Sequence, residues 1–479
     1  MATHTRLLIA GDWTQGSGST TFETLDPATG EVLGTAVEAT ATDVDAAVAA
    51  ATAAFADPAW AGMTPAARAR LLWRIADLIE ENAGELAELE SRDQGQSVVF
   101  ARATTGGAAE MLRYFAGWCT KLTGSTSAIS IPGMLHYTRR EPVGVCALIT
   151  PWNFPLSIAV WKLAPALATG NTVILKPAEQ TPLSTVRLAE LCVEAGVPAG
   201  VVNVLTGGPE VGQRLVAHPG VHKVSFTGST AVGREIVAAA AGNLKRVTLE
   251  LGGKAPSIVM RDADLDAAVS GNLLGGLINS GQACAAYSRF YVDRSRADEF
   301  TEKLSKAMAG LTMGPGMSPD TQLGPLVSAE HREKVEGYVT AGVDEGATVV
   351  VGGRRGDGAG FFFEPTLMVG VEHGMTVARD EVFGPVLPII TYDDPDELVD
   401  RANDTEYGLV ASVWTSDVAR GHRMAHQIRA GEVYVNTLPM LDPAAPWGGF
   451  KSSGWGREMS GEALDAYTET KGIWVNIGT

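Results

Sequence analysis

The sequence has little cysteine and no long apolar run, and these two absences exclude several kinds of protein. Its four cysteines, spread over 479 residues, match neither a disulfide framework nor a set of metal ligands. No stretch approaches the ~20 apolar residues that a membrane-spanning helix needs, and residues 1–13 lack the basic and apolar segments of a secretory signal. We therefore expect a cytoplasmic protein that binds neither a metal ion nor a membrane.

Positive charge is also scarce. The chain has 37 Lys and Arg against 55 Asp and Glu, which gives a formal net charge of −18. Nucleic acids and anionic membrane surfaces are bound by basic faces, so this balance excludes both as partners. The hydrophobic content of 45% is typical of a globular protein, and the length predicts two or three domains. We expect the ligand to be a small molecule.

What the sequence does contain is a regular alternation of apolar strands and helices from residue 143 onward. Two amphipathic helices, 42–55 and one that begins at the cap Thr64, precede it. Continuous apolar strands separated by helices indicate a parallel sheet covered on both faces, as in doubly wound nucleotide-binding domains. The expected strands are 143–149, 172–175, 201–204, 223–226 and 247–251, and the expected helices are 156–167, 183–195, 210–217 and 231–240.

The alternation restarts after Gly252-Gly253 and predicts a second α/β domain. Two segments fit neither domain: residues 124–141 are typical of a hairpin, and residues 471–477 alternate like a strand. They are either a hairpin and an edge strand of one molecule or strands that pair with another subunit. In the second domain the expected strands are 257–259, 290–292, 348–351 and 386–391, and the expected helices are 265–278, 297–308 and 330–345.

One cysteine has unusual surroundings. Cys284 follows Asn279-Ser280-Gly281-Gln282-Ala283, a turn of small and polar residues, whereas Cys119, Cys146 and Cys192 lie in apolar stretches. The backbone N–H groups of such a turn suit a thiolate nucleophile and an oxyanion formed beside it. Taken alone, a buried structural cysteine is the commoner interpretation, so the residues around the other strand ends must decide.

Two of these residues are candidates for catalysis. Asn153, in Thr150-Pro151-Trp152-Asn153-Phe154-Pro155 after the first strand, offers a neutral amide donor, although turn asparagines are common. Glu250 ends the fifth strand, just before Gly252-Gly253. A carboxylate in a cleft between domains is a candidate general base, although capping a glycine turn is an equally common role.

Three further features are candidates for nucleotide binding. Ser229 stands at the start of a helix, where free N–H groups attract phosphate, or it merely caps a tight turn. Lys176 and Glu179 follow the second strand at the edge where open sheets bind ligands, or they form a solvated pair. Glu381 and Phe383 share one face of an extended segment, or they are an ordinary structural pair. A thiolate, a base, an amide donor and a dinucleotide site together fit the oxidation of an aldehyde through a thioester.

These motifs are similar to those of the NAD(P)-dependent aldehyde dehydrogenase superfamily, which the chain resembles over nearly its whole length. The resemblance rests on Glu250-Leu251-Gly252-Gly253-Lys254, on Gly281-Gln282-Ala283-Cys284 and on the segment 446–454. It implies an aldehyde dehydrogenase-like α/β fold of two doubly wound domains with a small β bridging element. The resemblance implies a discontinuous NAD-binding domain (1–123 and 142–252) and a catalytic domain (253–450). Residues 124–141 and 451–479 are the implied oligomerisation segments, in a homodimer or homotetramer.

The resemblance also implies a role for each candidate residue. Cys284 attacks the aldehyde, Asn153 and the Cys284 N–H hold the oxyanion, and Glu250 activates water. Lys176 is counted among both the catalytic and the cofactor-binding residues. Because the Glu179 carboxylate accepts bonds from a ribose 2′-OH and repels a 2′-phosphate, NAD is expected rather than NADP. The full implied cofactor set is Thr150, Pro151, Trp152, Lys176, Glu179, Gly208, Gly212, Thr227, Gly228, Ser229, Leu251, Glu381 and Phe383.

The implied substrate pocket is apolar and aromatic, which favours an uncharged aliphatic or aromatic aldehyde. Trp447 stands where the family often has Phe, and the loop 438–443 matches no single substrate class. The residues expected to line the substrate pocket are Phe154, Trp161, Ile278, Tyr287, Leu441 and Trp447.

The sequence also bears on three rival functions. A cysteine protease is disfavoured, because Ala286 stands where the caspase signature Q-A-C-x-G has glycine and no motif supplies a histidine. A CoA-acylating member of the same superfamily is the nearer alternative, but Glu250 favours water as the acyl acceptor. A non-catalytic relative would be expected to lose the nucleophile, and Cys284 is present.

Overall fold

The first domain is built on a parallel sheet whose strand order reverses in the middle. The computed structural model describes residues 3–478, and its larger sheet has eight strands in the order β20-β12-β11-β8-β9-β10-β2-β3. The chain passes from β8 to β9 and β10 on one side, then returns to β11 and β12 on the other. The parallel strands are β8 (Val145–Ile149), β9 (Thr172–Lys176), β10 (Val202–Val204), β11 (Lys223–Thr227) and β12 (Arg246–Glu250).

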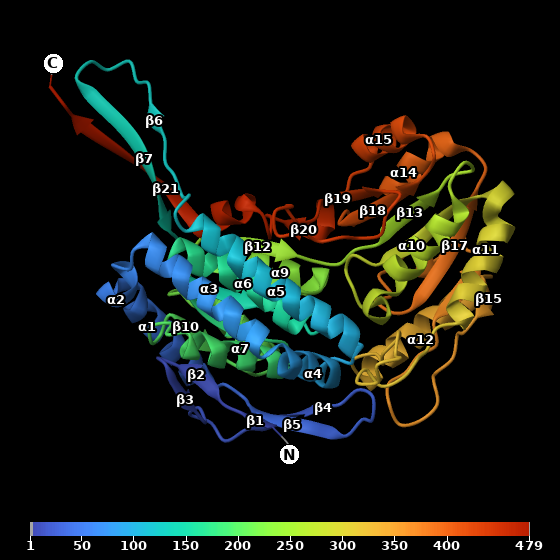
Figure 1. Cartoon of the computed structure of the whole chain (residues 1–479), viewed down its shortest axis with the longest axis horizontal. Coiled ribbons are helices and arrows are strands. Elements are labelled where there is room, and N and C mark those ends of the chain that lie inside the picture. Colours follow the sequence, from blue (N-terminus) through green and yellow to red (C-terminus); the bar gives the residue numbers. More distant parts are fainter. Residues whose placement is uncertain (1–2, 479) are drawn as a thin grey trace.

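Helices cover both faces of this sheet, which confirms the doubly wound architecture. On one face lie α3 (Pro65–Glu81), α5 (Val98–Trp118), α6 (Pro155–Thr169) and α7 (Leu183–Glu194); on the other lie α1 (Ala41–Ala56), α8 (Pro209–Ala217) and α9 (Thr230–Ala240). Figure 1 shows the layer of α3, α5 and α6 lying over the sheet. Thr64 caps α3 by accepting the Ala67 N–H, as its position before Pro65 predicts.

The N-terminal third contains elements that the sequence pattern did not predict. Two short strands extend the large sheet: β2 (Leu7–Ile9) pairs antiparallel with β10, and β3 (Asp12–Thr14) pairs antiparallel with β2. A separate three-stranded sheet is formed by β1 (Thr3–Thr5), β4 (Thr21–Leu25) and β5 (Val32–Val37), and α4 (Ala83–Asp93) precedes α5. At the other edge, β20 (Gly454–Trp455) pairs with β12, so part of the segment 451–479 belongs to the first sheet.

The second domain is also an α/β layer structure. Its seven strands lie in the order β15-β16-β17-β14-β13-β18-β19, and neighbouring strands are parallel except β15 and β16. The strands are β13 (Ala255–Val259), β14 (Tyr287–Asp293), β15 (Thr348–Val351), β16 (Thr366–Val369), β17 (Val386–Tyr392), β18 (Val410–Trp414) and β19 (Glu432–Val435), and the larger helices are α10 (Leu265–Leu277), α11 (Arg294–Ala309), α12 (Ala329–Asp344) and α15 (Val418–Gln427).

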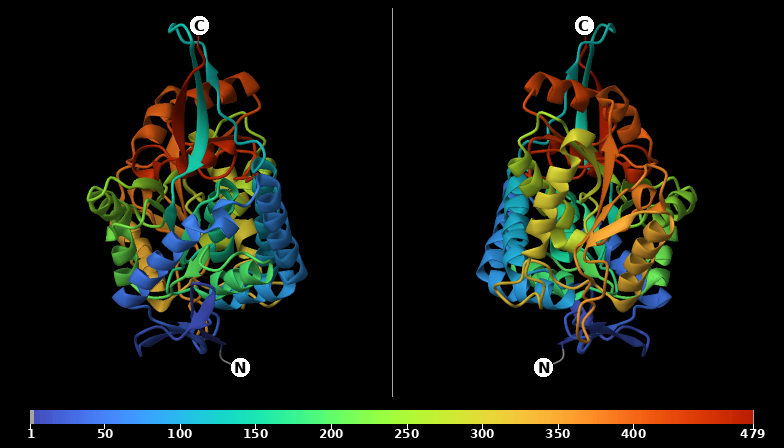
Figure 2. Two further views of the ribbon diagram at one scale, coloured as in Figure 1. Left: turned by 90° about the vertical axis from the view of Figure 1, so that its left-hand side faces the viewer. Right: turned by 90° about the vertical axis from the view of Figure 1, so that its right-hand side faces the viewer.

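A three-stranded arm projects from the body, as Figures 1 and 2 show. The predicted hairpin is present as β6 (Thr126–Ser127) and β7 (Met134–Pro142), and the C-terminal strand β21 (Thr468–Asn476) pairs along β7 within the same chain. Ile129 and Ile131, which the alternation assigned to the hairpin, lie in the connection between its strands. The order β21-β7-β6 leaves β21 at the edge of this sheet.

Residues 3–478 contain neither a candidate membrane-spanning helix nor a candidate metal-binding cluster. No helix in that range is both long enough and apolar enough to cross a membrane. The same residues contain no group of three or more His, Cys, Asp or Glu side chains arranged to hold a metal ion.

Candidate active site

The structure brings Glu250 and Cys284 together where the two domains join. Glu250 is the last residue of β12, and Leu251-Gly252-Gly253 then lead directly into β13. A Cβ at Gly253 would lie 2.4 Å from the carbonyl oxygen of Cys284. The linker between the domains therefore touches the nucleophile loop, and a glycine is required at that contact.

A sharp turn presents Cys284. After α10 the chain forms the short turn η1 (Ile278–Gly281), in which Asn279, Ser280 and Gly281 have φ values of 49°, 57° and 75°. Three successive left-handed residues are rare, because the conformation crowds every side chain except that of glycine. The turn leaves the N–H groups of Cys284 and Ala285 facing the sulfur.

The thiol of Cys284 lies in a low-dielectric and acidic environment. Burial raises its pKa above the ordinary thiol value, and the carboxylates of Glu381 and Glu250 raise this pKa further. The N–H groups of Cys284 and Ala285 act in the opposite direction because they stabilise the thiolate. The thiol is therefore mostly protonated at neutral pH in this state. The other three cysteines are buried, as predicted.

Asn153 is in contact with the cysteine loop. It lies in the loop between β8 and α6, is 3% exposed, and donates from Nδ2 to the carbonyl of Gln282 at 2.9 Å. A primary amide carries two N–H groups, so one remains for another acceptor. The remaining N–H makes Asn153 a candidate oxyanion donor beside the Cys284 loop.

Glu250 has the environment of a poised base. It is buried, and its Oε2 makes no hydrogen bond to the described residues. Burial raises its pKa well above the ordinary value, the nearby Glu458 raises this pKa further, and Lys162 and Arg457 lower it. A buried carboxyl with an elevated pKa and a free oxygen is suited to accept a proton from water.

A cavity of about 530 Å³ lies at the carboxyl ends of β8, β9 and β11, where ligands of doubly wound sheets bind. Nine of the residues predicted to bind the cofactor line this cavity: Thr150, Pro151, Trp152, Lys176, Glu179, Gly212, Thr227, Gly228 and Ser229. Sequence reasoning missed its apolar wall from α8 and α9, formed by Val216, Val232, Ile236 and Ala239. Those residues had the helical spacing of ordinary core positions.

The polar groups of this cavity fit a dinucleotide. The buried hydroxyls of Thr150 and Thr227 have no hydrogen-bond partner among the described residues, although both line the cavity. The Nζ of Lys176 lies 3.6 Å from the Glu179 carboxylate, and burial lowers its pKa. Ser229 caps α9 and directs the start of that helix at the cavity, which favours a phosphate. Lys176 thus lies with the cofactor residues.

The remaining predicted cofactor residues lie outside this cavity. Gly208 caps α8 in a neighbouring hollow, and Leu251 packs against Gly233 of α9. Glu381 accepts the Gly253 N–H at 2.8 Å, and burial raises its pKa to about 6. Phe383, with a left-handed φ of 57°, meets the Trp152 ring at 5.3 Å.

The sequence did not identify His331 of α12, which completes this aromatic cluster. Its Nε2 lies 2.7 Å from the Phe383 carbonyl oxygen, and its ring lies 5.2 Å from that of Trp152. Burial lowers the pKa of His331 to about 4. The imidazole is therefore neutral at physiological pH and bonds the carbonyl through an N–H donor.

The predicted substrate residues fall into separate groups. The rings of Trp161 and Trp447 lie 6.3 Å apart, and Phe154 meets Phe100 of α5 edge to face at 6.1 Å. Leu441 is half exposed on its loop. Tyr287 is fully buried in the catalytic core, and its hydroxyl donates to the Thr437 carbonyl.

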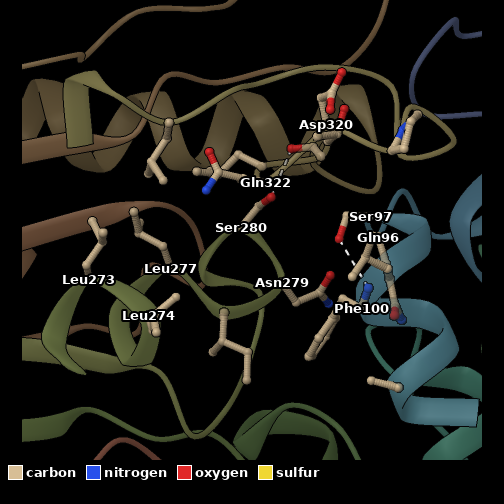
Figure 3. Close-up of a pocket in the computed structure, with 18 of the residues that line it drawn as sticks. Gln96, Ser97, Phe100, Leu273, Leu274, Leu277, Asn279, Ser280, Asp320 and Gln322 are labelled. Atoms are coloured by element: carbon tan, nitrogen blue, oxygen red, sulfur yellow. Dashed lines mark hydrogen bonds between the residues drawn. The ribbon is translucent and has the colours of Figure 1, made fainter. Parts of the chain in front are cut away.

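Ile278 lines a second cavity, of about 480 Å³, with Phe100 on the opposite side. Figure 3 shows Leu273, Leu274 and Leu277 of α10 facing this space from one side and the start of α5 from the other. Phe100 and these leucines were missed, although their helical spacing was visible, because no motif marked them as facing a cavity.

Comparisons with known proteins agree with this geometry. The sequence model described as "Aldehyde dehydrogenase family" matches residues 13–473. The phenylacetaldehyde dehydrogenase of Pseudomonas fluorescens is 45% identical, covering 98% of this chain and 95% of its own length. The betaine aldehyde dehydrogenase of Rhizobium etli is 44% identical, covering 98% and 97%. The solved NAD+ complex of an aldehyde dehydrogenase from Bacillus cereus superposes with a TM-score of 0.98 at 46% identity, covering 99% and 97%. This chain belongs to the aldehyde dehydrogenase family.

Proposed function

We propose that this protein oxidises an aldehyde to a carboxylic acid with NAD, through a covalent thioester on Cys284. The observation that carries the proposal is the convergence of three groups at the domain junction. The Cys284 sulfur, the Asn153 amide and the free Glu250 carboxylate oxygen come from two loops and one strand end and lie near one another and near a dinucleotide-sized cavity. Each group matches one step of the reaction.

The first step joins sulfur to carbon. The Cys284 thiolate attacks the aldehyde carbonyl, and the oxyanion of the resulting thiohemiacetal accepts bonds from the Asn153 amide and the Cys284 N–H. NAD, when bound, supplies the acceptor for the hydride that leaves this carbon, and a thioester remains. Glu250 then removes a proton from water, the water oxygen attacks the thioester, and the thiolate leaves. Aldehyde, NAD+ and water thus become carboxylate, NADH and two protons.

The choice of NAD over NADP rests on Glu179. Its carboxylate lines the cavity beside Lys176, where it accepts hydrogen bonds from a ribose diol and repels a 2′-phosphate. The solved Bacillus cereus relative was crystallised as an NAD+ complex, which supports the same cofactor for this chain.

An uncharged aliphatic or aromatic aldehyde is the substrate we propose. The aromatic pairs Trp161–Trp447 and Phe100–Phe154 and the half-exposed Leu441 offer apolar contacts. Of the two relatives above, one is named for phenylacetaldehyde, which is uncharged, and one for betaine aldehyde, which is cationic. A kinetic screen of phenylacetaldehyde, hexanal and betaine aldehyde tests the assignment, and the highest kcat/KM for betaine aldehyde would reverse it.

The basic test of the function is NADH formation. The purified protein should reduce NAD with an uncharged aldehyde and release the free acid, and replacing Cys284 with Ala should abolish this activity. CoA is the alternative acyl acceptor. The same assay is run with and without CoA, and the product is identified. If the reaction requires CoA and yields acyl-CoA, the acylating function is favoured over hydrolysis.

We also propose that the protein is a homodimer or homotetramer and lies in the cytoplasm. In this proposal, residues 1–123 and 142–252 form the NAD-binding domain and residues 253–450 form the catalytic domain. The arm is the oligomerisation element. Trp474 and Ile477 on the arm are 52% and 65% exposed, and apolar residues on an edge strand favour pairing with another subunit. The four free cysteines are compatible with a reducing compartment. Light scattering should give two or four times the mass of the chain, and a monomer would contradict the proposal.

A further inference from the structure

Two loops from different domains exchange side-chain amide bonds directly beneath the reaction site. Asn153, in the loop after β8, donates from Nδ2 to the carbonyl of Gln282 at 2.9 Å. Asn279, in the turn before Cys284, donates from its own Nδ2 to the carbonyl of Asn153 at the same distance of 2.9 Å. Each loop thus holds the other through one amide and one carbonyl, in a reciprocal pair that spans the domain junction.

The residue type at 279 serves both the backbone and this bond. The φ of Asn279 is 49°, in the left-handed region. Glycine adopts this conformation most readily, and asparagine is the best tolerated of the larger residues. The Nδ2 of Asn279 also reaches the Gln282 carbonyl at 3.5 Å, and Gln282 returns a bond from Nε2 to the Asn279 carbonyl at 3.1 Å. Glycine would satisfy the backbone but would remove the amide.

The loop that carries Asn153 is also supported from behind. Gln96 donates to the Asn153 carbonyl at 3.4 Å and to Glu90 at 3.3 Å, and Glu90 accepts the Leu156 N–H at 3.2 Å. These bonds are longer than the Asn279 bond, so Asn279 supplies the best hydrogen bond that the Asn153 carbonyl receives. Figure 3 shows Asn279 extending from the turn toward the start of α5, where Gln96 and Phe100 lie.

We propose that Asn279 is a positioning residue that aims the second N–H of Asn153 at the oxyanion formed on Cys284. The inference rests on the proposed function. The Asn153 amide is planar, so fixing one N–H on Gln282 fixes the direction of the other. The bond from Asn279 fixes the backbone from which that amide projects. Without it, the two loops separate slightly, and an error of about 1 Å at a reacting centre costs on the order of a hundredfold in rate.

The test uses Asn279→Gly, which keeps the left-handed backbone and deletes the amide. Asn436→Gly is the matched control: Asn436 also has a left-handed φ, of 56°, and its Nδ2 donates to the Thr415 carbonyl at 2.8 Å, outside the two loops. Asn279→Gly loses the bonds to the Asn153 and Gln282 carbonyls. Asn436→Gly loses the bond to the Thr415 carbonyl and the bond that its Oδ1 accepts from the Thr415 N–H. Each variant therefore loses two side-chain hydrogen bonds from the same backbone conformation. Circular dichroism and thermal unfolding establish that each variant is folded.

Three rates are compared for the wild type and both variants. Two of them, NAD reduction with an aldehyde and hydrolysis of p-nitrophenyl acetate without NAD, pass through an oxyanion on the acyl carbon. The third, alkylation of Cys284 by iodoacetamide, displaces iodide from a saturated carbon and forms no oxyanion. We expect Asn279→Gly to lower the first two rates about a hundredfold and to leave alkylation within about twofold, while Asn436→Gly changes none of the three by more than about threefold.

Equal losses in all three rates for Asn279→Gly would mean that the residue only maintains the fold near the thiol, and would overturn the proposal. Unchanged NAD reduction and ester hydrolysis would also overturn it. Both outcomes are distinct from a failure of the proposed function, in which the wild-type protein itself would reduce no NAD with any aldehyde.

Discussion

Lys162 and Glu458 form a buried ion pair beside Glu250, although the two residues lie 296 positions apart in the chain. The two charges act on the Glu250 carboxyl in opposite directions. The ammonium group of Lys162 lowers the pKa of Glu250, and the carboxylate of Glu458 raises it. Burial raises this pKa most, and the pair shifts it further in both directions, so both charges influence the pH at which Glu250 can act as the proposed base.

This arrangement predicts opposite pH shifts for two substitutions. Lys162→Met removes the positive charge, so the pKa of Glu250 should rise and the ascending limb of kcat should move to higher pH. Glu458→Gln removes the negative charge, so the same limb should move to lower pH. The measurement is the pH dependence of steady-state p-nitrophenyl acetate hydrolysis, in which water must attack the thioester. Shifts of the same sign in both variants would contradict this account of the site.

Replacing Glu250 with Gln should separate acylation from hydrolysis. The amide keeps the size of the side chain but cannot accept a proton from water, so the thioester should accumulate. We expect a burst of about one NADH per active site followed by turnover slower by roughly 10²–10⁴-fold, the usual contribution of a general base. Stopped-flow absorbance measures the burst, and intact-protein mass spectrometry should detect the acyl group on Cys284. Full steady-state turnover in this variant would exclude Glu250 as the base.

The alkylation rate of Cys284 should rise with pH beyond the range of an ordinary thiol. Burial and the neighbouring carboxylates raise its pKa, and only the thiolate reacts. Below the pKa the thiolate fraction grows about tenfold for each pH unit, so the logarithm of the iodoacetamide rate should increase with a slope near 1 between pH 7 and pH 9. A plateau below pH 8 would indicate a lowered pKa and a different environment for the sulfur.

The main features of the fold, and the segments that hold the groups proposed to react, could be predicted from sequence because they follow from local patterns. Glu250 ends an apolar strand, and Cys284 follows a turn of small residues, so each could be located within its own segment. Short strands such as β2 and β20 could not be predicted, because they have only three and two residues and therefore show no periodicity. Each pairs with a strand that is distant in the sequence. The arm was predicted as a hairpin and a strand, but its pairing was left open.

The environment of the site was less predictable than its members. Lys162 is a buried lysine within a long helix, and nothing in its segment indicates a partner at position 458. The bond between Asn279 and Asn153 likewise crosses 126 positions of sequence. The sequence motifs thus located the groups proposed to react, whereas the surrounding charges and hydrogen bonds depend on how the two domains meet.

Glu179 should control the choice of cofactor. Replacing it with Ser removes the charge that repels a 2′-phosphate and keeps a hydroxyl for the ribose. We expect kcat/KM for NADP to rise relative to NAD by about tenfold or more, equivalent to about 1.4 kcal/mol. Initial rates with each cofactor at saturating aldehyde measure the ratio. Gln180→Ser, at the adjacent position of the same cavity, is the control. An unchanged ratio in Glu179→Ser would mean that other groups select the cofactor.

The close contact between the domain linker and the nucleophile loop predicts opposite effects for two glycine substitutions. In Gly253→Ala the new Cβ would lie 2.4 Å from the Cys284 carbonyl oxygen, and neither backbone segment can move without displacing the nucleophile. We expect a loss of about 1–3 kcal/mol in the free energy of unfolding, as for other overpacked positions, together with lower activity.

Gly106→Ala is the matched control, since a Cβ there meets nothing within 4 Å. Gly106 lies inside α5, where alanine favours the helix by about 1 kcal/mol, so this variant should be more stable and fully active. Thermal unfolding and NAD reduction measured on both proteins test the contact, and a Gly253→Ala enzyme as stable and as active as the wild type would show that the linker and the nucleophile loop are farther apart than the structure has them.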